Sequence, residues 1–347
     1  MSDWGARVQQ AWETPSAIGV LLAPLAWIYS GLLRCRHGFR RLGWPRTERL
    51  PVPVVVVGNL VVGGAGKTPT VLAIVDLMVR EGMRPGIVSR GHGREGEEIV
   101  HVEPGTPART SGDEPLLLRR RSGVPVVVAR DRVAAARALL ARHPGIDVIV
   151  ADDGLQHHRL GRDVEVIVFD ERGTGNGKLL PAGPLRERMG ARPPPSSLVL
   201  YNADRPSTPW PGAIAIRRFG GLVELAGWWR QEPPSKVALA LLQGRPVVAA
   251  CGLARPQRFF SMLLSVGLDV EPLALPDHFD FANLPWPPTT ADVVVTEKDA
   301  VKLDPARLGR TRVWVAALDF ALPTAFADAL LRLLDRPSRN PHENAPA

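Results

Sequence analysis

The sequence predicts an α/β fold built on a parallel sheet, together with a second, smaller α/β domain. Short apolar runs rich in valine alternate with helix-like segments from residue 51 onward. Strands without a polar face are typical of a parallel sheet whose two faces are both covered by helices. The same alternation begins again near residue 241, after a proline-rich stretch, which indicates the second domain.

The individual elements follow from the same alternation. Apolar, β-type runs bounded by glycine, proline or charged residues are taken as strands, and longer mixed runs between them as helices. In the first part of the chain we expect strands at 54–57, 85–89, 124–129, 147–151 and 164–169, and helices at 70–80 and 132–142. In the second part we expect strands at 246–251, 292–296 and 312–317, and helices at 257–266 and 325–334.

These elements divide the 347 residues into domains. The proline-rich stretch 192–211 contains Pro193, Pro194 and Pro195 and is interpreted as a boundary or connector. The predicted ranges are an N-terminal helical region 1–50, a core domain 51–210, a linker 211–240, a smaller α/β domain 241–335 and a disordered polar tail 336–347.

Composition limits the classes of function. The two cysteines, Cys35 and Cys251, cannot form a disulfide framework or a four-thiolate metal site, and a reduced cytosolic setting fits them. The net charge of +8 would suit nucleic acid, an anionic membrane surface or a phosphorylated substrate. Aromatic residues are few and no nucleic-acid-binding signature is present, so we expect no nucleic acid partner.

The most apolar stretch, 17–33, lies close to the N-terminus and is followed at once by arginines. The run is short for a transmembrane helix and contains Pro24, and it has neither the leading charge nor the cleavage site of a secretory signal. We interpret it as a helix lying in a membrane interface, with a single span and a buried N-terminal helix as alternatives. The arginines that would meet anionic lipid are Arg34, Arg36, Arg40, Arg41, Arg46 and Arg49.

The stretch 54–70, VVVVGNLVVGGAGKTPT, is the most informative in the chain. An apolar strand, a glycine-rich loop, Lys-Thr and a helix form the phosphate cradle of P-loop proteins, in which loop and helix N–H groups face the anion. Lys67 would neutralise the β- and γ-phosphates and Thr68 would hold Mg²⁺. The predicted nucleotide-binding residues are Val61, Val62, Gly63, Gly64, Ala65, Gly66, Lys67 and Thr68.

The loop departs from the usual P-loop pattern at one position, because Val61 stands where the first glycine is expected. Gly64 and Gly66 can still supply left-handed or close-approach geometry. A plain glycine-rich turn between a strand and a helix is the alternative. The strand before it and the helix after it favour the phosphate site.

Carboxylates near strand ends are candidates for metal binding and proton transfer. Asp152 and Asp153 follow the strand 147–151, where a P-loop enzyme holds Mg²⁺, although Asp-Asp-Gly is also a turn signal. Asp113, in the predicted loop SGDEP with Glu114, could accept the proton of an attacking hydroxyl, although a lone loop carboxylate is more often solvated. His278, Arg90 and Arg186 are further loop residues, and such arginines can grip phosphate.

Seven segments, in order, give the chain a specific resemblance. They are GNLVVGGAGKTP (58–69), SRG (89–91), GDEP (112–115), DDGLQHHRL (152–160), LLPAGPLRE (179–187), the DH of LPDHFDF (277–278) and TEKDAVKL (296–303). Together they make the chain similar to the tetraacyldisaccharide 4′-kinases, the lipid A 4′-kinases of Gram-negative bacteria.

The resemblance implies a reaction and a location. Members of that family transfer the γ-phosphate of ATP, with Mg²⁺, to the 4′-hydroxyl of tetraacyldisaccharide 1-phosphate, giving lipid IVA at the cytoplasmic face of the inner membrane. The family fold is a P-loop α/β domain joined by a short β linker to a smaller α/β domain, with an N-terminal membrane-docking element. No obligate protein partner is expected.

The resemblance also implies residue roles. Lys67 and Thr68 would bind phosphate and Mg²⁺, and Asp152 and Asp153 would occupy the metal-linked carboxylate positions. Asp113 would accept the proton, with His278 pairing with it, and Glu114 would help with Mg²⁺. Arg90 and Arg186 would contact the substrate.

The sequence is also compatible with two other classes of function. One is a P-loop ATPase or GTPase that energises a membrane-associated partner without phosphorylating a lipid. The other is a non-catalytic nucleotide-binding module at the membrane. Glu297-Lys298-Asp299 superficially resembles the guanine motif of GTPases, but the glutamate at its first position weakens that match.

Overall fold

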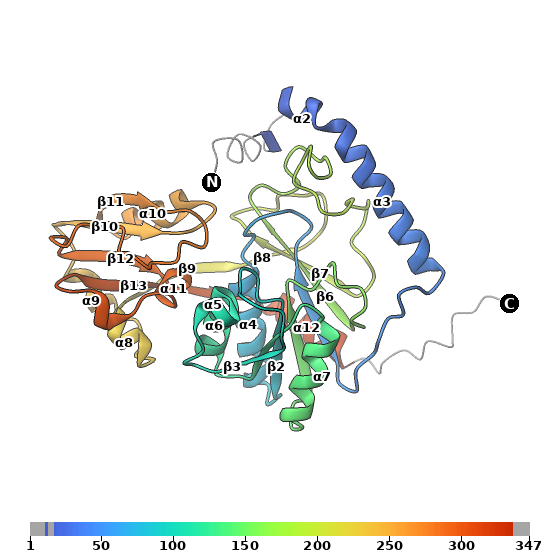
Figure 1. Ribbon diagram of the computed structural model, residues 1–347, viewed down its shortest axis with the longest axis horizontal. Coiled ribbons are helices and arrows are strands. Elements are labelled where there is room, and N and C mark those ends of the chain that lie inside the picture. The colour runs from blue at the N-terminus through green and yellow to red at the C-terminus, as the bar shows by residue number, and fades with distance from the viewer. Residues whose placement is uncertain (1–10, 13–16, 336–347) are drawn as a thin grey trace. The chain divides into compact units, whose positions relative to one another are not determined.

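The computed structural model describes residues 11–12 and 17–335, which form two compact units (Figure 1). The larger unit contains the described residues up to Arg90, Val124–Ala215 and the described residues from Ala321. The smaller unit contains Gly91–Gly123 and Ile216–Phe320. The predicted domain ranges were continuous in sequence, whereas each unit is assembled from separate stretches. The tail 336–347, predicted to be disordered, lies outside the described residues.

The larger unit is built on a parallel sheet in the order β4-β2-β5-β1-β6-β7-β8. The valines of β1 are almost fully buried, as are the central residues of β5 and β6, so the continuous apolar runs lie in the core as predicted. Its strands are β1 (Val54–Gly58), β2 (Pro85–Ser89), β4 (Val126–Val128), β5 (Val148–Asp152), β6 (Val164–Asp170), β7 (Ser197–Asn202) and β8 (Ala213–Ile214).

Helices pack against this sheet. α4 (Lys67–Arg80) contacts β1, β2 and β5, α7 (Arg132–Arg142) contacts β2 and β4, and α12 (Thr324–Leu334) contacts β6 and β7. The strands and helices predicted for this part of the chain are confirmed, apart from boundaries. The proline-rich stretch 192–211, expected as a boundary or connector, instead contains β7, which pairs with β6 inside the sheet.

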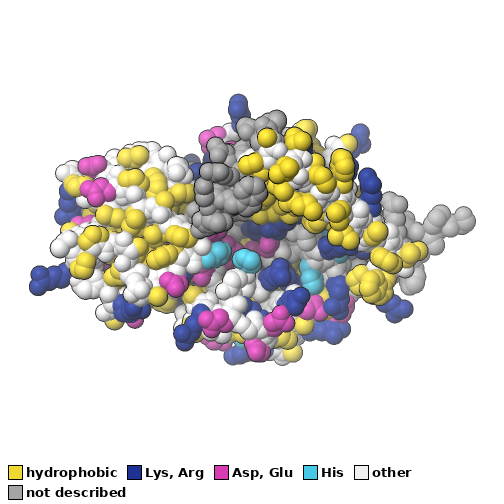
Figure 2. Space-filling view, turned by 45° about the horizontal axis from the view of Figure 1, so that its top comes forward, with side chains coloured by type: hydrophobic (Ala, Val, Ile, Leu, Met, Phe, Trp, Pro, Cys, Tyr) yellow, Lys and Arg dark blue, Asp and Glu magenta, His cyan; other side chains and the backbone are white. Residues whose placement is uncertain are grey.

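The N-terminal apolar segment forms α2 (Ala17–Leu21) and α3 (Ala23–Arg41) of the larger unit. Pro24 lies in the first turn of α3, where proline is tolerated, so the helix continues through the arginines that follow. Figure 2 shows hydrophobic side chains gathered over α2 and α3, with lysines and arginines beside them. The exposed large hydrophobic residues of these two helices are Val20, Leu21, Leu25, Trp27, Ile28, Leu32 and Phe39. Among the described residues, no helix is long and apolar enough to cross a bilayer.

The smaller unit has a sheet in the order β11-β10-β12-β13-β9, in which β11, β10, β12 and β13 pair in parallel. The predicted strands and the helix near 257–266 are confirmed. The strands of this sheet are β9 (Ile216–Glu224), β10 (Pro246–Cys251), β11 (Asp269–Ala274), β12 (Asp292–Thr296) and β13 (Arg312–Ala321). The short strand β3 (Val100–Val102) also belongs to the smaller unit but not to this sheet. Its helices are α5 (Ala108–Ser111), α6 (Asp113–Ser122), α8 (Leu225–Trp229), α9 (Lys236–Ala240), α10 (Pro256–Ser265), α11 (Glu297–Ala300) and the 3₁₀ turn η1 (Pro305–Arg307).

Candidate active site

The glycine-rich loop of the larger unit joins the end of β1 to the start of α4. Gly66 caps α4 in the left-handed region, with φ of 90°, and a side chain there would collide with the amide of Asn202. Gly63 also has positive φ, 99°. Gly64 has neither a positive φ nor a close neighbour. The left-handed or close-approach geometry predicted for Gly64 and Gly66 is therefore confirmed for Gly66 and wrong for Gly64. Gly63 has that geometry instead.

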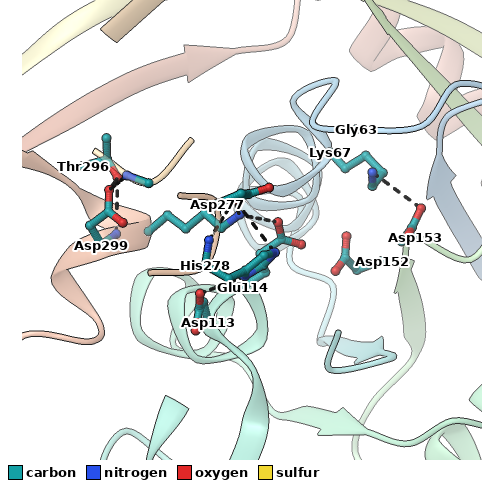
Figure 3. A network of polar contacts seen from close by, with 12 residues as sticks. Gly63, Lys67, Asp113, Glu114, Asp152, Asp153, Asp277, His278, Thr296 and Asp299 are labelled. Carbon is teal, nitrogen blue, oxygen red and sulfur yellow. Dashed lines mark hydrogen bonds and ion pairs between the residues drawn. The ribbon is translucent and has the colours of Figure 1, made fainter. Parts of the chain in front are cut away.

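Lys67 is the first residue of α4 and its side chain is largely buried. Its Nζ donates to Oδ1 of Asn59 over 3.4 Å and lies 3.6 Å from Oδ1 of Asp153 (Figure 3). Thr68 follows in the same helical turn and is half-buried. The loop therefore places an ammonium group and a hydroxyl at the positively polarised N-terminus of a helix, as an anion site requires.

Asp152 and Asp153 lie at the carboxyl end of β5. Asp152 is opposite Val57 of β1 in the parallel register, is buried, and accepts a 2.9 Å hydrogen bond from Ser89 Oγ. Asp153 has a positive φ of 46°, and its carboxylate receives Nη1 of Arg186 at 3.1 Å. The predicted carboxylate pair is thus at the same sheet edge as the glycine-rich loop.

The pKa of Asp153 reflects this setting. Burial alone raises the pKa of a carboxyl group, but Lys67, Arg186 and Arg132 surround Asp153 and outweigh that effect. The pKa of Asp153 is therefore lowered, and the group is an anion at neutral pH.

Three residues that the sequence analysis did not single out also contact the loop. Asn59 accepts from Lys67, Asn202 Nδ2 donates to the carbonyl of Ala65 over 3.1 Å, and Arg172 donates to the carbonyls of Val62 and Gly64. Each follows or ends a strand of the sheet: β1, β7 and β6. A polar residue at the carboxyl end of a strand is the sequence signal that could have identified them. That signal predicts a contact with the loop only when the order of the strands in the sheet is known.

A cavity of about 680 Å³ lies at the same sheet edge of the larger unit. Its lining begins directly after Asn202 and includes Glu171, next to Arg172. The residues lining it are Glu171, Ala203, Asp204, Arg205, Pro206, Ser207, Thr208 and Pro209.

The two predicted substrate arginines have different surroundings within the larger unit. Arg186 bridges the Asp153 carboxylate and Oε1 of Gln156, at 3.1 Å from each. Arg90 is exposed directly after β2. Their contact with substrate stays a prediction.

α3 is attached to the loops that carry these groups. Tyr29 Oη donates to the carbonyl of Arg186 over 2.9 Å, and Arg36 Nη2 donates to the carbonyl of Gln156 over 2.6 Å. The polar side of the N-terminal helix is thus bonded to the segments that hold Asp153, while its apolar residues remain exposed.

A second group of charged residues lies within the smaller unit. Asp113 and Glu114 are the first two residues of α6, not part of a loop as predicted, because Gly112 ends α5 with a φ of 88° and lets α6 begin at once. His278 Nδ1 lies 3.0 Å from Oδ2 of Asp113 (Figure 3). The structure therefore brings together two residues that the family resemblance had paired, although 165 positions separate them.

Two lysines lie beside this pair. Lys302 Nζ is 3.4 Å from Oδ2 of Asp113, and Lys298 Nζ is 3.0 Å from Oδ1 of Asp277 and 3.6 Å from Oε1 of Glu114. Burial alone raises the pKa of Asp113, but the hydrogen bond with His278 and the charge of Lys302 outweigh burial. The pKa of Asp113 is therefore below its usual value, so the side chain is available as a proton acceptor.

The magnesium residues predicted from the sequence fall into both units: Thr68, Asp152 and Asp153 in the larger, and Glu114 in the smaller, where it pairs with Lys298. Among the described residues, no three or more His, Cys, Asp and Glu side chains cluster as a metal site. The magnesium roles stay predictions.

Comparison with known proteins decides the family. Residues 18–335 match the family model LpxK, described as tetraacyldisaccharide-1-P 4′-kinase. The chain belongs to the tetraacyldisaccharide-1-P 4′-kinase family. Its relatives include proteins named tetraacyldisaccharide 4′-kinase from Leptothrix cholodnii, 55% identical over 97% of each chain, and Methylibium petroleiphilum, 56% identical over 94% of this chain and 92% of that one.

A solved structure of a tetraacyldisaccharide-1-P 4′-kinase family member has the same fold. It is LpxK from Aquifex aeolicus in complex with ATP, 26% identical, with a TM-score of 0.74 over 91% of this chain and 99% of that one. The predicted α/β fold is therefore confirmed. Membership in the family makes this chain a kinase and favours that function over the ATPase, GTPase and binding-module alternatives.

Proposed function

We propose that this kinase transfers the γ-phosphate of ATP to the 4′-hydroxyl of tetraacyldisaccharide 1-phosphate. The observation that carries the proposal is the position of Lys67 at the end of a glycine-rich loop, where it donates to Asn59 and lies near Asp153. The names of the relatives supply the acceptor, and the ATP complex of the Aquifex aeolicus protein supplies the donor.

The larger unit provides the nucleotide site. Loop and helix N–H groups would bind the β- and γ-phosphates, with Lys67 neutralising their charge. The cavity after Asn202 has the size and position for the adenosine part, because ligands of open parallel sheets bind beyond the carboxyl ends of the strands. Asn202 would connect the phosphate-binding loop to the cavity for the adenosine part, since its amide donates a hydrogen bond to the loop carbonyl of Ala65.

The residues of the larger unit also fit a magnesium ion. Thr68, Asp152 and Asp153 offer a hydroxyl and two carboxylates, the oxygen donors that Mg²⁺ prefers. Bound there with ATP, Mg²⁺ would neutralise the charge that develops on the phosphates. Glu114 is better described as the partner of Lys298, at 3.6 Å.

The smaller unit provides the proton acceptor. As the oxygen of the sugar hydroxyl bonds to the γ-phosphorus, the bond from that phosphorus to the β,γ-bridging oxygen breaks and ADP leaves. The hydroxyl proton passes to the carboxylate of Asp113, which His278 orients through Nδ1. The lowered pKa of Asp113 keeps the carboxylate ionised before the reaction.

The N-terminal helices would place the enzyme on its lipid substrate at the cytoplasmic face of the inner membrane. Trp27, Ile28 and Leu32 are each more than 60% exposed, and the basic C-terminal half of α3 would meet anionic lipid at roughly 1 kcal/mol for each arginine near the surface. Because Tyr29 and Arg36 bond to the loops beside Asp153, docking of α3 would bring the bilayer surface to the active site.

Replacing Trp27, Ile28 and Leu32 together with serine should weaken binding to vesicles that contain anionic phospholipid by roughly tenfold or more, because apolar surface is lost from the docking face. Co-sedimentation measures this binding. Leu264→Ser, at an exposed leucine of α10 in the smaller unit, is the matched control and should bind like the parent. Unchanged vesicle binding by the triple variant would count against the docking role.

The reaction is tested by ATP turnover with and without tetraacyldisaccharide 1-phosphate, with the product identified by mass. A lipid kinase should consume ATP only when the lipid is present and should convert it to lipid IVA, a gain of one phosphate. Turnover that ignores the lipid would indicate an ATPase, and binding without turnover a non-catalytic module. Either result would overturn the proposal.

A further inference from the structure

The segment TEKDAVKL (296–303) carries the most deeply buried carboxylate beside Asp113. Asp299, in α11, has a side chain with no exposed surface. Its Oδ2 accepts hydrogen bonds from the Thr296 hydroxyl at 2.7 Å and from the backbone N–H of Gly252 at 3.1 Å (Figure 3). Asp299 is therefore fixed from the ends of two strands of the smaller unit, because Thr296 ends β12 and Gly252 directly follows β10.

Lys302 connects this fixed carboxylate to Asp113. Its side chain is only 5% exposed, and its Nζ lies 3.1 Å from Oδ1 of Asp299 and 3.4 Å from Oδ2 of Asp113. The same ammonium lies over the ring of Phe281, 5.3 Å from the centroid. A buried ammonium is costly unless it is paired, and Asp299 alone would satisfy that need. The position of Lys302 near Asp113 is therefore not needed to compensate for the burial of its ammonium group.

Among the described residues, the two side-chain contacts of the Asp113 carboxylate both fall on one of its two oxygens. His278 and Lys302 both approach Oδ2, the first at 3.0 Å and the second at 3.4 Å. Lys298, the other lysine nearby, is instead paired with Asp277 and Glu114. Two cationic or hydrogen-bonding groups on one oxygen restrict rotation of the carboxylate about its bond to the side chain and leave Oδ1 for the hydroxyl of the acceptor.

We propose that Lys302, held in place by Asp299, is a positioning residue that fixes the carboxylate of Asp113 so that Oδ1 receives the substrate proton. This inference rests on the proposed function, because it needs Asp113 to act as the proton acceptor. Lys302 itself touches no substrate and acts only through Asp113.

A double-mutant cycle tests the coupling. Lys302→Met, Asp113→Asn and the combined variant are compared by kcat and KM at saturating lipid. Lys302→Met should lower kcat about tenfold or more, with KM for ATP within about twofold of the parent, because a misaligned base loses part of the 10²–10⁴-fold typical of proton transfer. In the Asp113→Asn background the same change should cost less than about twofold. Lys302→Arg, which keeps the charge, should recover part of the loss.

A merely structural role for Lys302 would give a different result. The fold-loss would then be the same in both backgrounds, and that outcome, or an unchanged kcat in Lys302→Met, would overturn the inference. Because Lys302→Met leaves Asp299 buried without its cation, Asp299→Asn/Lys302→Met is the second variant, in which no charge is stranded. It should show the same loss of kcat with a thermal midpoint close to the parent's. Lys236→Met, at an exposed lysine of α9, is the matched control.

The same cycle separates this inference from the proposed function. If the parent does not phosphorylate the lipid, or if Asp113→Asn is fully active, the proposed reaction or its proton acceptor is wrong. If Asp113→Asn is impaired but Lys302→Met costs as much in that background as in the parent, the proposed reaction survives and only the positioning role of Lys302 fails.

Discussion

Lys67→Ala should lower kcat for lipid phosphorylation by about two orders of magnitude or more, by analogy with the removal of one donor that stabilises a transition state. Lys67 is the ammonium at the head of α4, and the charge on the transferred phosphoryl group is greatest while its bonds are changing. Asp153 would keep Arg186 as a partner at 3.1 Å, so the fold of the larger unit should survive.

Steady-state kinetics of the purified variant, with circular dichroism to confirm folding, measure this effect. Lys178→Ala, at an exposed lysine of the same unit, is the matched control and should retain the parent's activity. A Lys67 variant that phosphorylates the lipid as fast as the parent would contradict the phosphate-binding role of the loop.

Asp113→Ala should lower kcat by roughly 10²- to 10⁴-fold, the contribution typical of general-base catalysis, while KM for ATP changes little. Asp113 lies in the smaller unit, whereas the phosphate loop and the cavity after Asn202 lie in the larger one. Lys302 would keep Asp299 as a partner after the substitution, so no buried ammonium loses its only anion.

Separate measurement of kcat and of KM for ATP is informative for Asp113. A loss confined to kcat indicates an interaction made in the transition state, whereas a matching rise in KM for ATP would indicate a role in nucleotide binding and would refute the base assignment. Asp113→Asn keeps the shape of the side chain and should be nearly as impaired. If it were as active as the parent, another group would have to accept the proton.

Much of the fold could be predicted because its strands are buried on both faces. The four valines of β1 are almost fully buried, and a continuous apolar run between turn signals is typical of a strand covered on both sides. The prediction failed where local signals conflicted. Pro193–Pro195 indicate a connector, although β7 follows within a few residues, and SGDEP has the composition of a loop, although its DEP begins α6. Acidic residues followed by proline are also a helix start, which is what Asp113, Glu114 and Pro115 form.

The site was predictable to the extent that it is local in sequence. Lys67 and Thr68 follow from one motif, and Asp152 and Asp153 from the strand before them. Asn202 and Arg172 were missed because their contacts depend on β7 and β6 being neighbours of β1 in the sheet order, which no local pattern reveals. Asp113 and His278 were paired through the family resemblance, since nothing in their own surroundings in the sequence connects them.

The last helix of the described residues, α12, has a consequence for how the chain is synthesised. α12 covers β6 and β7, with Phe326 and Leu330 buried, yet it is translated more than a hundred residues after both strands. A nascent chain must therefore carry an uncovered apolar face through most of its synthesis, which is the condition under which chaperones bind. Because each unit is assembled from separate stretches of the chain, no single uninterrupted fragment contains one unit alone and complete. Truncation at residue 215 should therefore yield an aggregation-prone product instead of an isolated nucleotide-binding half.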